Sequence, residues 1–266
     1  MINYETEPAP QNAELLVVMP VYNEEASVRK VVLEWFDEIQ QWTEHFVFVA
    51  INDGSVDHTP QVLSRLQRQL GPRLEVIEQP NAGHGQTCLN AYRIAVNRGI
   101  PYVFQIDSDG QCDPQYFFRF WRQREKFDVI YGHRVRRDDG WRRVVASMVL
   151  KYTLLLSAGV SCIDANVPYR LMRTTILPEP LSKIPADIFL ANVVLSVLLK
   201  RAKNVRHSSV PIRFRERYGG EPSVRLSKFG DKALELIRQI RGLPETHSSK
   251  SEENPGLPAL ADEKLV

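Results

Sequence analysis

The pair of carboxylates in Asp107-Ser108-Asp109 is the feature of this sequence best suited to chemistry, because it directly follows an apolar run. Two carboxylates one residue apart in a turn can both reach one hard divalent cation, and Gln111 offers a third oxygen. Mg²⁺ or Mn²⁺ held by so few protein oxygens keeps positions free for substrate phosphates and would stabilise a departing diphosphate. An isolated pair of this kind is more often a solvated acidic turn, so its surroundings have to decide.

Three more polar clusters follow apolar runs earlier in the chain. Asp53 could accept hydrogen bonds from a base or a ribose, or it could cap the next helix. The segment PVYNEE, which begins at Pro20, could be no more than a helix cap and a helix start. Gly83-His84-Gly85 lacks the third glycine of a dinucleotide-binding loop, so an NAD site is not expected there.

Short apolar runs that alternate with helical patterns must position these clusters. Helices are expected with Asn23 as a cap, from Thr59-Pro60, over Gln86–Arg98 and from Asp113-Pro114. Continuous apolar strands separated by single helices predict an α/β fold with a mainly parallel sheet covered on both faces. Ligands bind such sheets outside the carboxyl ends of the strands, where every polar cluster falls. The expected strands are Leu15–Met19 (closed by Pro20), Phe46–Ile51, Leu74–Ile77, Tyr102–Ile106 and Phe127–Tyr131.

The second half of the chain is less regular. Arg134–Arg143 reads as a basic loop, and Val210–Phe214 as a strand. Residues 1–13 are expected to form an N-terminal extension, residues 14–242 one domain, and residues 243–266 a disordered tail rich in Pro, Ser and Glu. Helices are expected over Val144–Ser157, Ile188–Lys203 and Lys228–Arg241.

The composition limits the classes of protein that the chain can be. Its 266 residues are 43% hydrophobic and 25% charged, which excludes a mainly disordered or fibrous protein. Lys and Arg total 34 against 32 Asp and Glu, and this balance argues against a nucleic-acid partner. Three widely spaced cysteines indicate reduced thiols in a cytoplasmic protein. No secretory signal and no apolar run of about 18 residues is visible, so a membrane-spanning helix is not expected.

The segments PVYNEE, INDGSVDHT, NAGHGQT and QIDSDGQCDP, in this order and spacing, resemble those of family-2 glycosyltransferases with the GT-A fold. Later segments, YGHRVRRDD, IDANVPYRLMR and VPIRFRERYGGEPS, are similar to those of polyprenyl-phosphate glycosyltransferases of the dolichol-phosphate mannosyltransferase type. The resemblance covers about Glu14 to Ile240. It implies a nucleotide-diphosphate sugar as the donor and a polyprenyl phosphate as the acceptor, with inversion at the anomeric carbon.

The resemblance also implies roles for individual residues. Asp107, Asp109 and Gln111 match the metal site for Mg²⁺ or Mn²⁺, and Asp107, Asp109 and Arg134 match catalytic positions. The family's G-E-S-K ending departs here to Gly-Glu-Pro-Ser-Val-Arg, so that Arg225 would replace the lysine. The residues that match nucleotide-sugar contacts are Pro20, Tyr22, Glu24, Ile51, Asp53, Asp107, Ser108, Asp109, Arg134, Arg217 and Arg225.

The acceptor is the least determined part of this interpretation. A hydroxyl nucleophile needs a general base, and Asp187 is the only carboxylate of the helix where an acid is usual. A phosphate monoester, with a second pKa of about 6, is already anionic and needs none. The Arg-rich loop beside an apolar helix could dock the protein on the inner face of the membrane, or it could be a solvated loop beside a core helix. A membrane subunit could also be a partner of the chain. Two alternatives stay open: a saccharide or other hydroxyl acceptor, and a catalytically silent protein that binds sugar nucleotides.

Overall fold

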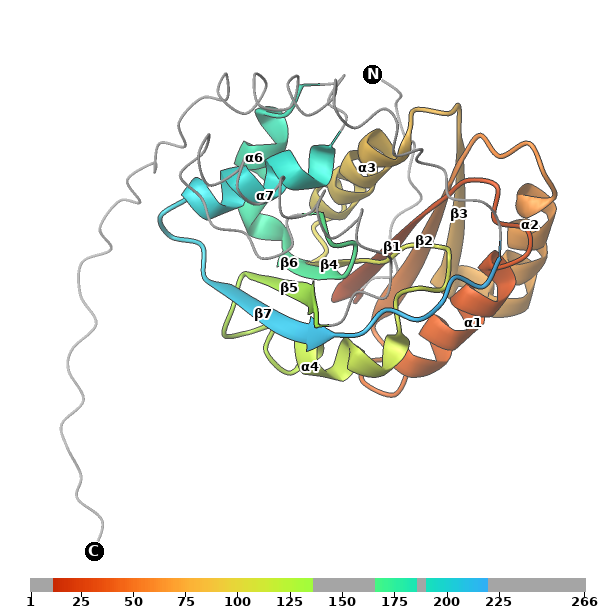
Figure 1. The fold of residues 1–266 in the computed structure, drawn as a ribbon, viewed down its shortest axis with the longest axis horizontal. Coiled ribbons are helices and arrows are strands. Elements are labelled where there is room, and N and C mark those ends of the chain that lie inside the picture. The colour runs from red at the N-terminus through yellow and green to blue at the C-terminus, as the bar shows by residue number, and fades with distance from the viewer. Residues whose placement is uncertain (1–11, 136–165, 186–189, 220–266) are drawn as a thin grey trace, which may run out of the picture.

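A computed structural model of the chain describes residues 12–135, 166–185 and 190–219 (Figure 1). Its centre is a seven-stranded sheet in the order β3-β2-β1-β4-β6-β5-β7, in which β6 alone runs antiparallel to its neighbours. The carboxyl ends of the other six strands therefore meet at one edge. The strands are β1 (Leu15–Val21), β2 (Phe46–Asp53), β3 (Leu74–Gln79), β4 (Tyr102–Gln105), β5 (Val129–Arg134), β6 (Arg170–Arg173) and β7 (His207–Ile212).

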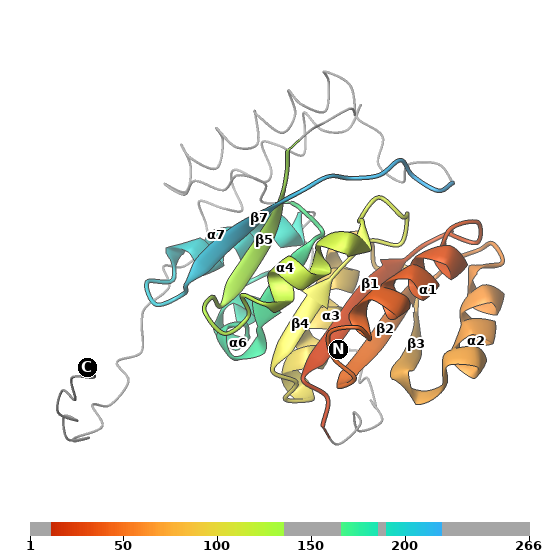
Figure 2. The same ribbon diagram turned by 90° about the horizontal axis from the view of Figure 1, so that it is seen from below.

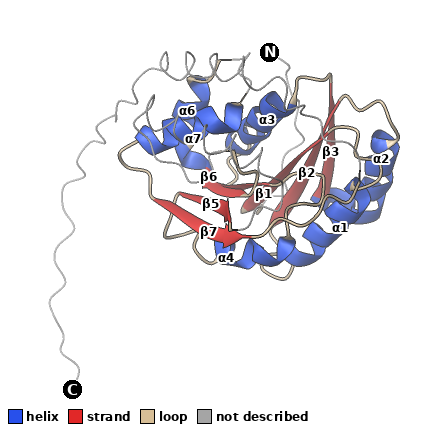
Figure 3. Cartoon of the chain, in the orientation of Figure 1, coloured by secondary structure: helices blue, strands red, loops and turns tan. Residues whose placement is uncertain are grey.

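Helices cover both faces of this sheet, as predicted. Figures 1 and 2 show α3, α6 and α7 on one face and α1 and α4 on the other, with α2 beside the β3 edge. Figure 3 shows the same layers coloured by secondary structure. The described α-helices are α1 (Val28–Ile39), α2 (Thr59–Leu70), α3 (His84–Asn97), α4 (Phe117–Trp121), α6 (Pro178–Ser182) and α7 (Ala191–Arg201), with short 3₁₀ turns at Gly71–Arg73, Pro114–Tyr116 and Thr174–Ile176.

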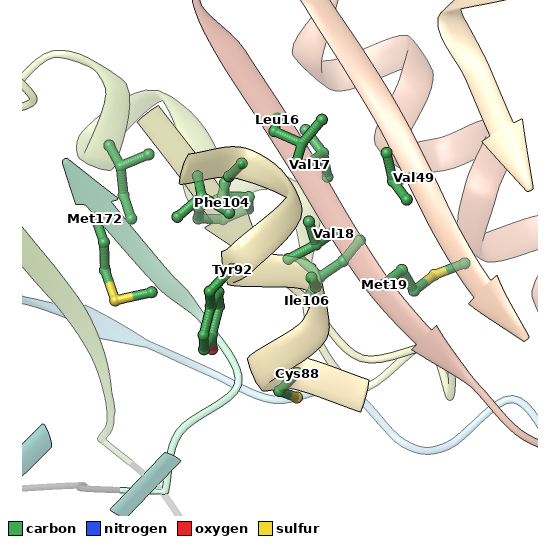
Figure 4. Packing of buried hydrophobic residues seen from close by; sticks show 14 of the residues in the cluster. Leu16, Val17, Val18, Met19, Val49, Cys88, Tyr92, Phe104, Ile106 and Met172 are labelled. Atoms are coloured by element: carbon green, nitrogen blue, oxygen red, sulfur yellow. The ribbon is translucent and has the colours of Figure 1, made fainter. Parts of the chain in front are cut away.

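The core lies on both sides of β1 and β2, every residue of which is buried. Trp35 of α1 is fully buried, and its ring lies 5.5 Å from that of Phe104 and 5.4 Å from that of Tyr169. On the other face, Tyr92 and Cys88 of α3 join the cluster shown in Figure 4. Burial of both faces explains why these strands read as continuous apolar runs rather than as alternating ones.

The structure confirms the alternation of strands and helices but shifts several boundaries. Pro20 does not close β1 but lies inside it, opposite Ile51 of β2. It is tolerated because β4 pairs with β1 only as far as Val18, so that no strand lies on that side of Pro20. The fifth strand begins at Val129 rather than at Phe127, α3 begins at His84 rather than at Gln86, and β7 covers His207–Ile212 rather than Val210–Phe214.

One sequence-based expectation was wrong, and one strand was missed. Asn23 does not cap α1, whose N-cap is Ser27; Asn23 instead adopts a positive φ of 53° and accepts a hydrogen bond from the Val56 N–H at 2.9 Å. No strand was expected at β6, which inserts antiparallel between β4 and β5. It is only four residues long and begins and ends with arginine, so its sequence carries little strand signal.

Several predictions fall on residues that the structure does not describe. These are the basic loop beyond Val135, the helices over Val144–Ser157 and Lys228–Arg241, the first residues of the helix at Ile188, and the tail from residue 243. Within the described part of the chain, no helix combines the length and the apolar character that crossing a membrane requires.

Candidate active site

The carboxyl ends of β1, β2 and β4 bring the polar clusters of the sequence together. The Ser27 hydroxyl lies 3.1 Å from the Ser108 carbonyl oxygen and 2.5 Å from Glu24 Oε2, which joins the loop after β1 to the turn after β4. The Glu24 N–H donates to Thr59 Oγ1 at 2.8 Å, which joins the same loop to the start of α2. The strand-end clusters therefore form one connected site, as the parallel topology predicts.

Arg217 links two of the predicted site carboxylates. Its guanidinium contacts Glu24 Oε1 through Nη2 and lies 3.4 Å from Asp109 Oδ2 through Nη1. The side chains are 23% exposed for Arg217, 13% for Asp109 and 6% for Glu24, so these charges meet in a partly dehydrated place. Attraction between charges is stronger in such surroundings than in bulk water. The arrangement places one guanidinium between two carboxylates beside the turn after β4.

Glu24 is a buried carboxyl group that needs such partners. Burial raises the pKa of Glu24, whereas the Ser27 hydroxyl and the charge of Arg217 lower it and offset part of the rise. The nearby carboxylates of Asp109 and Asp107 raise the pKa of Glu24 further. Three acidic groups this close together repel one another and attract positive charge, which Arg217 or a bound cation can supply.

Asp107 has the surroundings expected of a cation ligand. Its Oδ1 atom is buried and has no hydrogen-bond partner among the described residues. Burial raises the pKa of Asp107 to about 6, the charge of Asp109 adds to the rise, and the His84 imidazole, 3.8 Å away, opposes it. A buried carboxylate oxygen without a hydrogen-bond donor, close to a second carboxylate, has the oxygen chemistry that suits Mg²⁺ or Mn²⁺. A bound divalent ion would reverse the rise in pKa.

The fit to a metal is limited in one respect. No group of three or more His, Cys, Asp or Glu side chains in the described ranges could hold an ion. Asp109 is also partly engaged, because its Oδ1 accepts the Gln111 N–H at 3.0 Å while its Oδ2 meets Arg217. Few protein oxygens are typical of Mg²⁺ sites that complete their shell with water and substrate phosphate.

Asp53 performs a structural task in this site. Its carboxylate accepts the Ala82 N–H at 2.8 Å, the Gly83 N–H at 2.9 Å and the Gln79 side-chain amide at 2.6 Å. It thereby fastens the loop after β3 to the end of β2. Contact between Asp53 and a base or ribose stays a prediction.

The other predicted residues lie at the same edge with different exposures. Pro20, Ile51 and Ser108 are buried, whereas Tyr22 is 37% exposed at the end of β1. Arg134 is the last residue of β5, and its guanidinium lies 5.0 Å from the Phe214 ring. Its positive charge lowers the pKa of Asp107, which indicates that the two are electrostatic neighbours.

Two further predicted residues, Arg225 and Asp187, lie outside the described residues.

The sequence did not reveal two residues, Glu34 and Tyr218, that contact each other next to the site. Glu34, on α1, accepts hydrogen bonds from Tyr218 and Arg215, which lie in the segment after β7. Glu34 carried no signal because it reads as an ordinary polar position on an amphipathic helix. Tyr218 follows Arg217 in the segment VPIRFRERYGGEPS, whose sequence gives no sign that the tyrosine contacts α1.

Comparison with known proteins connects this geometry to a family. The model described as "Glycosyl transferase family 2" matches residues 16–179. A curated relative from Edwardsiella ictaluri, undecaprenyl-phosphate 4-deoxy-4-formamido-L-arabinose transferase, is 23% identical over 234 residues, covering 86% of this chain and 68% of the relative. An uncharacterized glycosyltransferase of Bacillus subtilis is 27% identical over 175 residues, and this alignment covers 61% of this chain and 50% of the relative. The match therefore spans between half and about two thirds of these relatives.

Solved structures share the fold at low identity. Glucosyl-3-phosphoglycerate synthase from Mycobacterium tuberculosis, in complex with Mn²⁺, UDP-glucose and phosphoglyceric acid, superimposes with a TM-score of 0.60 at 17% identity, covering 88% of this chain and 82% of that one. TarS of S. aureus in complex with UDP gives a TM-score of 0.52 at 22% identity, with coverages of 74% and 57%. At these identities the likeness supports the GT-A fold.

Proposed function

The chain belongs to glycosyltransferase family 2, and we propose that it moves a sugar from a nucleoside-diphosphate donor to a polyprenyl phosphate with inversion. The observation that carries the proposal is the corner after β4, where Asp107 lies close to Asp109 and Arg217 contacts Asp109. Two carboxylates and a guanidinium at the carboxyl edge of a parallel sheet suit a diphosphate accompanied by a cation. Relatives named for transfer to undecaprenyl phosphate support the acceptor.

The donor is expected along the ends of β1, β2 and β4. Pro20, Ile51 and Asp53 would border the nucleoside, with Tyr22 exposed beside them. Arg217 and Arg134 would face the diphosphate, and Arg225 would add to them from beyond the described residues. As fixed positive charges aimed at the leaving group, these guanidinium groups stabilise the negative charge that develops on it.

A divalent ion, Mg²⁺ or Mn²⁺, would be held by Asp107, Asp109 and Gln111. When bound, it supplies Lewis-acid stabilisation to the diphosphate oxygens. Arg217 contacts Asp109, so this guanidinium would lie beside both the carboxylate that holds the ion and the donor phosphates.

The transfer itself is a displacement. An oxygen of the acceptor phosphate forms a bond to the anomeric carbon while the bond to the leaving diphosphate oxygen breaks, and the electron pair departs with the nucleoside diphosphate. Because a phosphate monoester with a second pKa of about 6 is anionic at neutral pH, the acceptor brings its own nucleophile. The proposal therefore requires no general base.

The test is incubation with radiolabelled sugar nucleotides of uridine, guanosine and deoxythymidine, together with undecaprenyl phosphate in detergent and Mn²⁺. Label that enters the organic phase supports the proposal, and Asp109→Asn should abolish it. Label that reaches only water-soluble saccharides would replace the lipid acceptor with a hydroxyl one. Binding of the donor without transfer to any acceptor would indicate a silent sugar-nucleotide binding protein.

Membrane location is a further part of the proposal. A lipid acceptor has to be reached at a bilayer surface, so we expect the chain to act at the inner face, either peripherally or with a membrane subunit. The relatives' names place them in lipid-linked sugar transfer, which supports this expectation. Flotation with anionic vesicles would test it.

A further inference from the structure

The residues that follow β7 cross the turn after β4 like a strap, and we use that name for residues 213–219. The Arg215 N–H donates to the Gln111 carbonyl oxygen at 2.9 Å, and the Tyr218 N–H donates to the Asp109 carbonyl oxygen at 3.0 Å. Phe214 forms an isolated β-bridge with Cys112. The strap is thus tied by its backbone to the turn that carries Asp109.

The Tyr218 ring lies directly on Gly110. A Cβ atom placed on Gly110 would lie 2.4 Å from the ring, and Gly110 has a φ of +81°, so glycine is required there for two separate reasons. The Lys30 Nζ atom lies 3.8 Å from the centre of the same ring. Tyr218 is therefore packed from both the turn and α1.

Glu34 fixes the far end of this tyrosine. Its carboxylate oxygens accept the Tyr218 hydroxyl at 2.9 and 3.0 Å, and Oε2 accepts Arg215 Nη2 at 2.8 Å. One carboxylate on α1 therefore holds two side chains of the strap. Hydrogen bonds to a charged acceptor are stronger than neutral ones, so this contact can determine where the strap lies.

We propose that Glu34 and Tyr218 are positioning residues that hold Arg217 in line with the donor diphosphate; this inference rests on the proposed function. Arg217 immediately precedes Tyr218, and its guanidinium meets Asp109 and Glu24 from the strap. A shift of the Tyr218 backbone would move Arg217 with it. Glu34 and Tyr218 lie outside the reacting atoms and act through Arg217.

The first measurement is amide hydrogen exchange of the free protein. In Tyr218→Phe and Glu34→Ala, the Arg215 and Tyr218 amides should exchange at least about tenfold faster, because the strap loses a hydrogen bond to a charged group. Two matched controls, Tyr116→Phe beside the same turn and Asp37→Ala on the same helix, should leave these amides unchanged. Unchanged protection in Tyr218→Phe and Glu34→Ala would overturn the proposal.

The second measurement is calorimetric binding of UDP, GDP and dTDP in the presence of Mn²⁺. For the nucleotide that the wild type binds most tightly, both variants should weaken binding about tenfold, and the double variant little more than either. The controls should bind like the wild type. Faster strap exchange with unchanged nucleotide affinity would also refute the positioning role.

The two measurements separate the two claims. A wild-type protein that binds none of the nucleotides contradicts the proposed function, whatever the exchange shows. A wild-type protein that binds one of them, together with variants that bind it equally well, contradicts only the role of Glu34 and Tyr218. In transfer assays, the KM for the donor should rise in both variants while the KM for the acceptor stays constant.

Discussion

Asp109 has partners on both carboxylate oxygens, which makes its substitution informative. Asp109→Asn keeps the shape of the side chain but removes the charge that meets Arg217 and that would face a cation. Removal of one electrostatic group of this kind lowers transfer by roughly 10²-fold or more. Rates of sugar transfer at saturating donor check this.

The matched control for this change is Asp113→Asn, in the same segment. The Asp113 carboxylate caps the short turn at Pro114–Tyr116 by accepting the Gln115 N–H at 3.1 Å. Asparagine is an equally good cap, so this variant should retain activity. Full activity in Asp109→Asn would contradict the assignment of the turn.

Asp53 offers a prediction about stability rather than about chemistry. Asp53→Leu would leave the Ala82 and Gly83 N–H groups without their acceptor. Loss of hydrogen-bond partners for partly buried donors costs about 1–3 kcal/mol of unfolding free energy. Urea denaturation measures this, and an unchanged midpoint would contradict the structural task assigned to Asp53.

The arrangement of strands and helices shows which features a sequence can predict. The continuous apolar runs of β1 and β2 report burial on both faces directly, so these strands were predicted correctly. The site clusters were also predicted, because polar residues at strand ends stand out against apolar runs.

Contacts between distant segments were not predictable. Glu34 and Tyr218 are 184 positions apart, and only the folded chain brings them together. The antiparallel insertion of β6 depends on pairing with β4 and β5, which leaves little mark on a four-residue segment. Local patterns record which face of an element is buried, and they carry little information about which partner buries it.

A buried polar network joins three elements behind the site. The Tyr92 hydroxyl of α3 contacts Gln105 Oε1 of β4 and lies 2.8 Å from Asn192 Oδ1 of α7. Tyr92→Phe would remove this hydroxyl from a fully buried place and leave Asn192 Oδ1 without its donor, at about 1–3 kcal/mol of unfolding free energy, whereas Gln105 Oε1 would still accept from Asn192 Nδ2 at 3.1 Å. Chemical denaturation checks the loss. A substitution without effect would show that the hydrogen bond between the two amides is sufficient without the hydroxyl.

At the scale of the whole molecule, Asp128 connects the ends of β5, β6 and β7 through Arg173 and Arg206. These contacts predict how the stability of the protein changes in acid. The side-chain and backbone hydrogen bonds of Arg206 and the charge of Arg173 together lower the pKa of Asp128 to about 2, although burial opposes this. Since the pKa is depressed on folding, the stabilisation is present above about pH 4 and is lost as the pH falls toward 2.

The corresponding experiment compares Asp128→Asn with the wild type across this range. Because Arg206 is half exposed, solvent screening limits the expected difference in unfolding free energy to about 1–2 kcal/mol at pH 7. The difference should shrink as the pH falls from 4 to 2. A constant difference over this interval would exclude the charge of Asp128 as its cause.

The acceptor decides between the proposed reaction and its alternatives. The measurement is a pair of parallel assays, identical except for the acceptor. One contains undecaprenyl phosphate and the other undecaprenol, which differs only in lacking the phosphate, and each receives the same labelled sugar donor. The account predicts a labelled lipid from the phosphate alone, joined to the sugar through a phosphodiester. Equal labelling of the alcohol, or label confined to the aqueous phase, would contradict it.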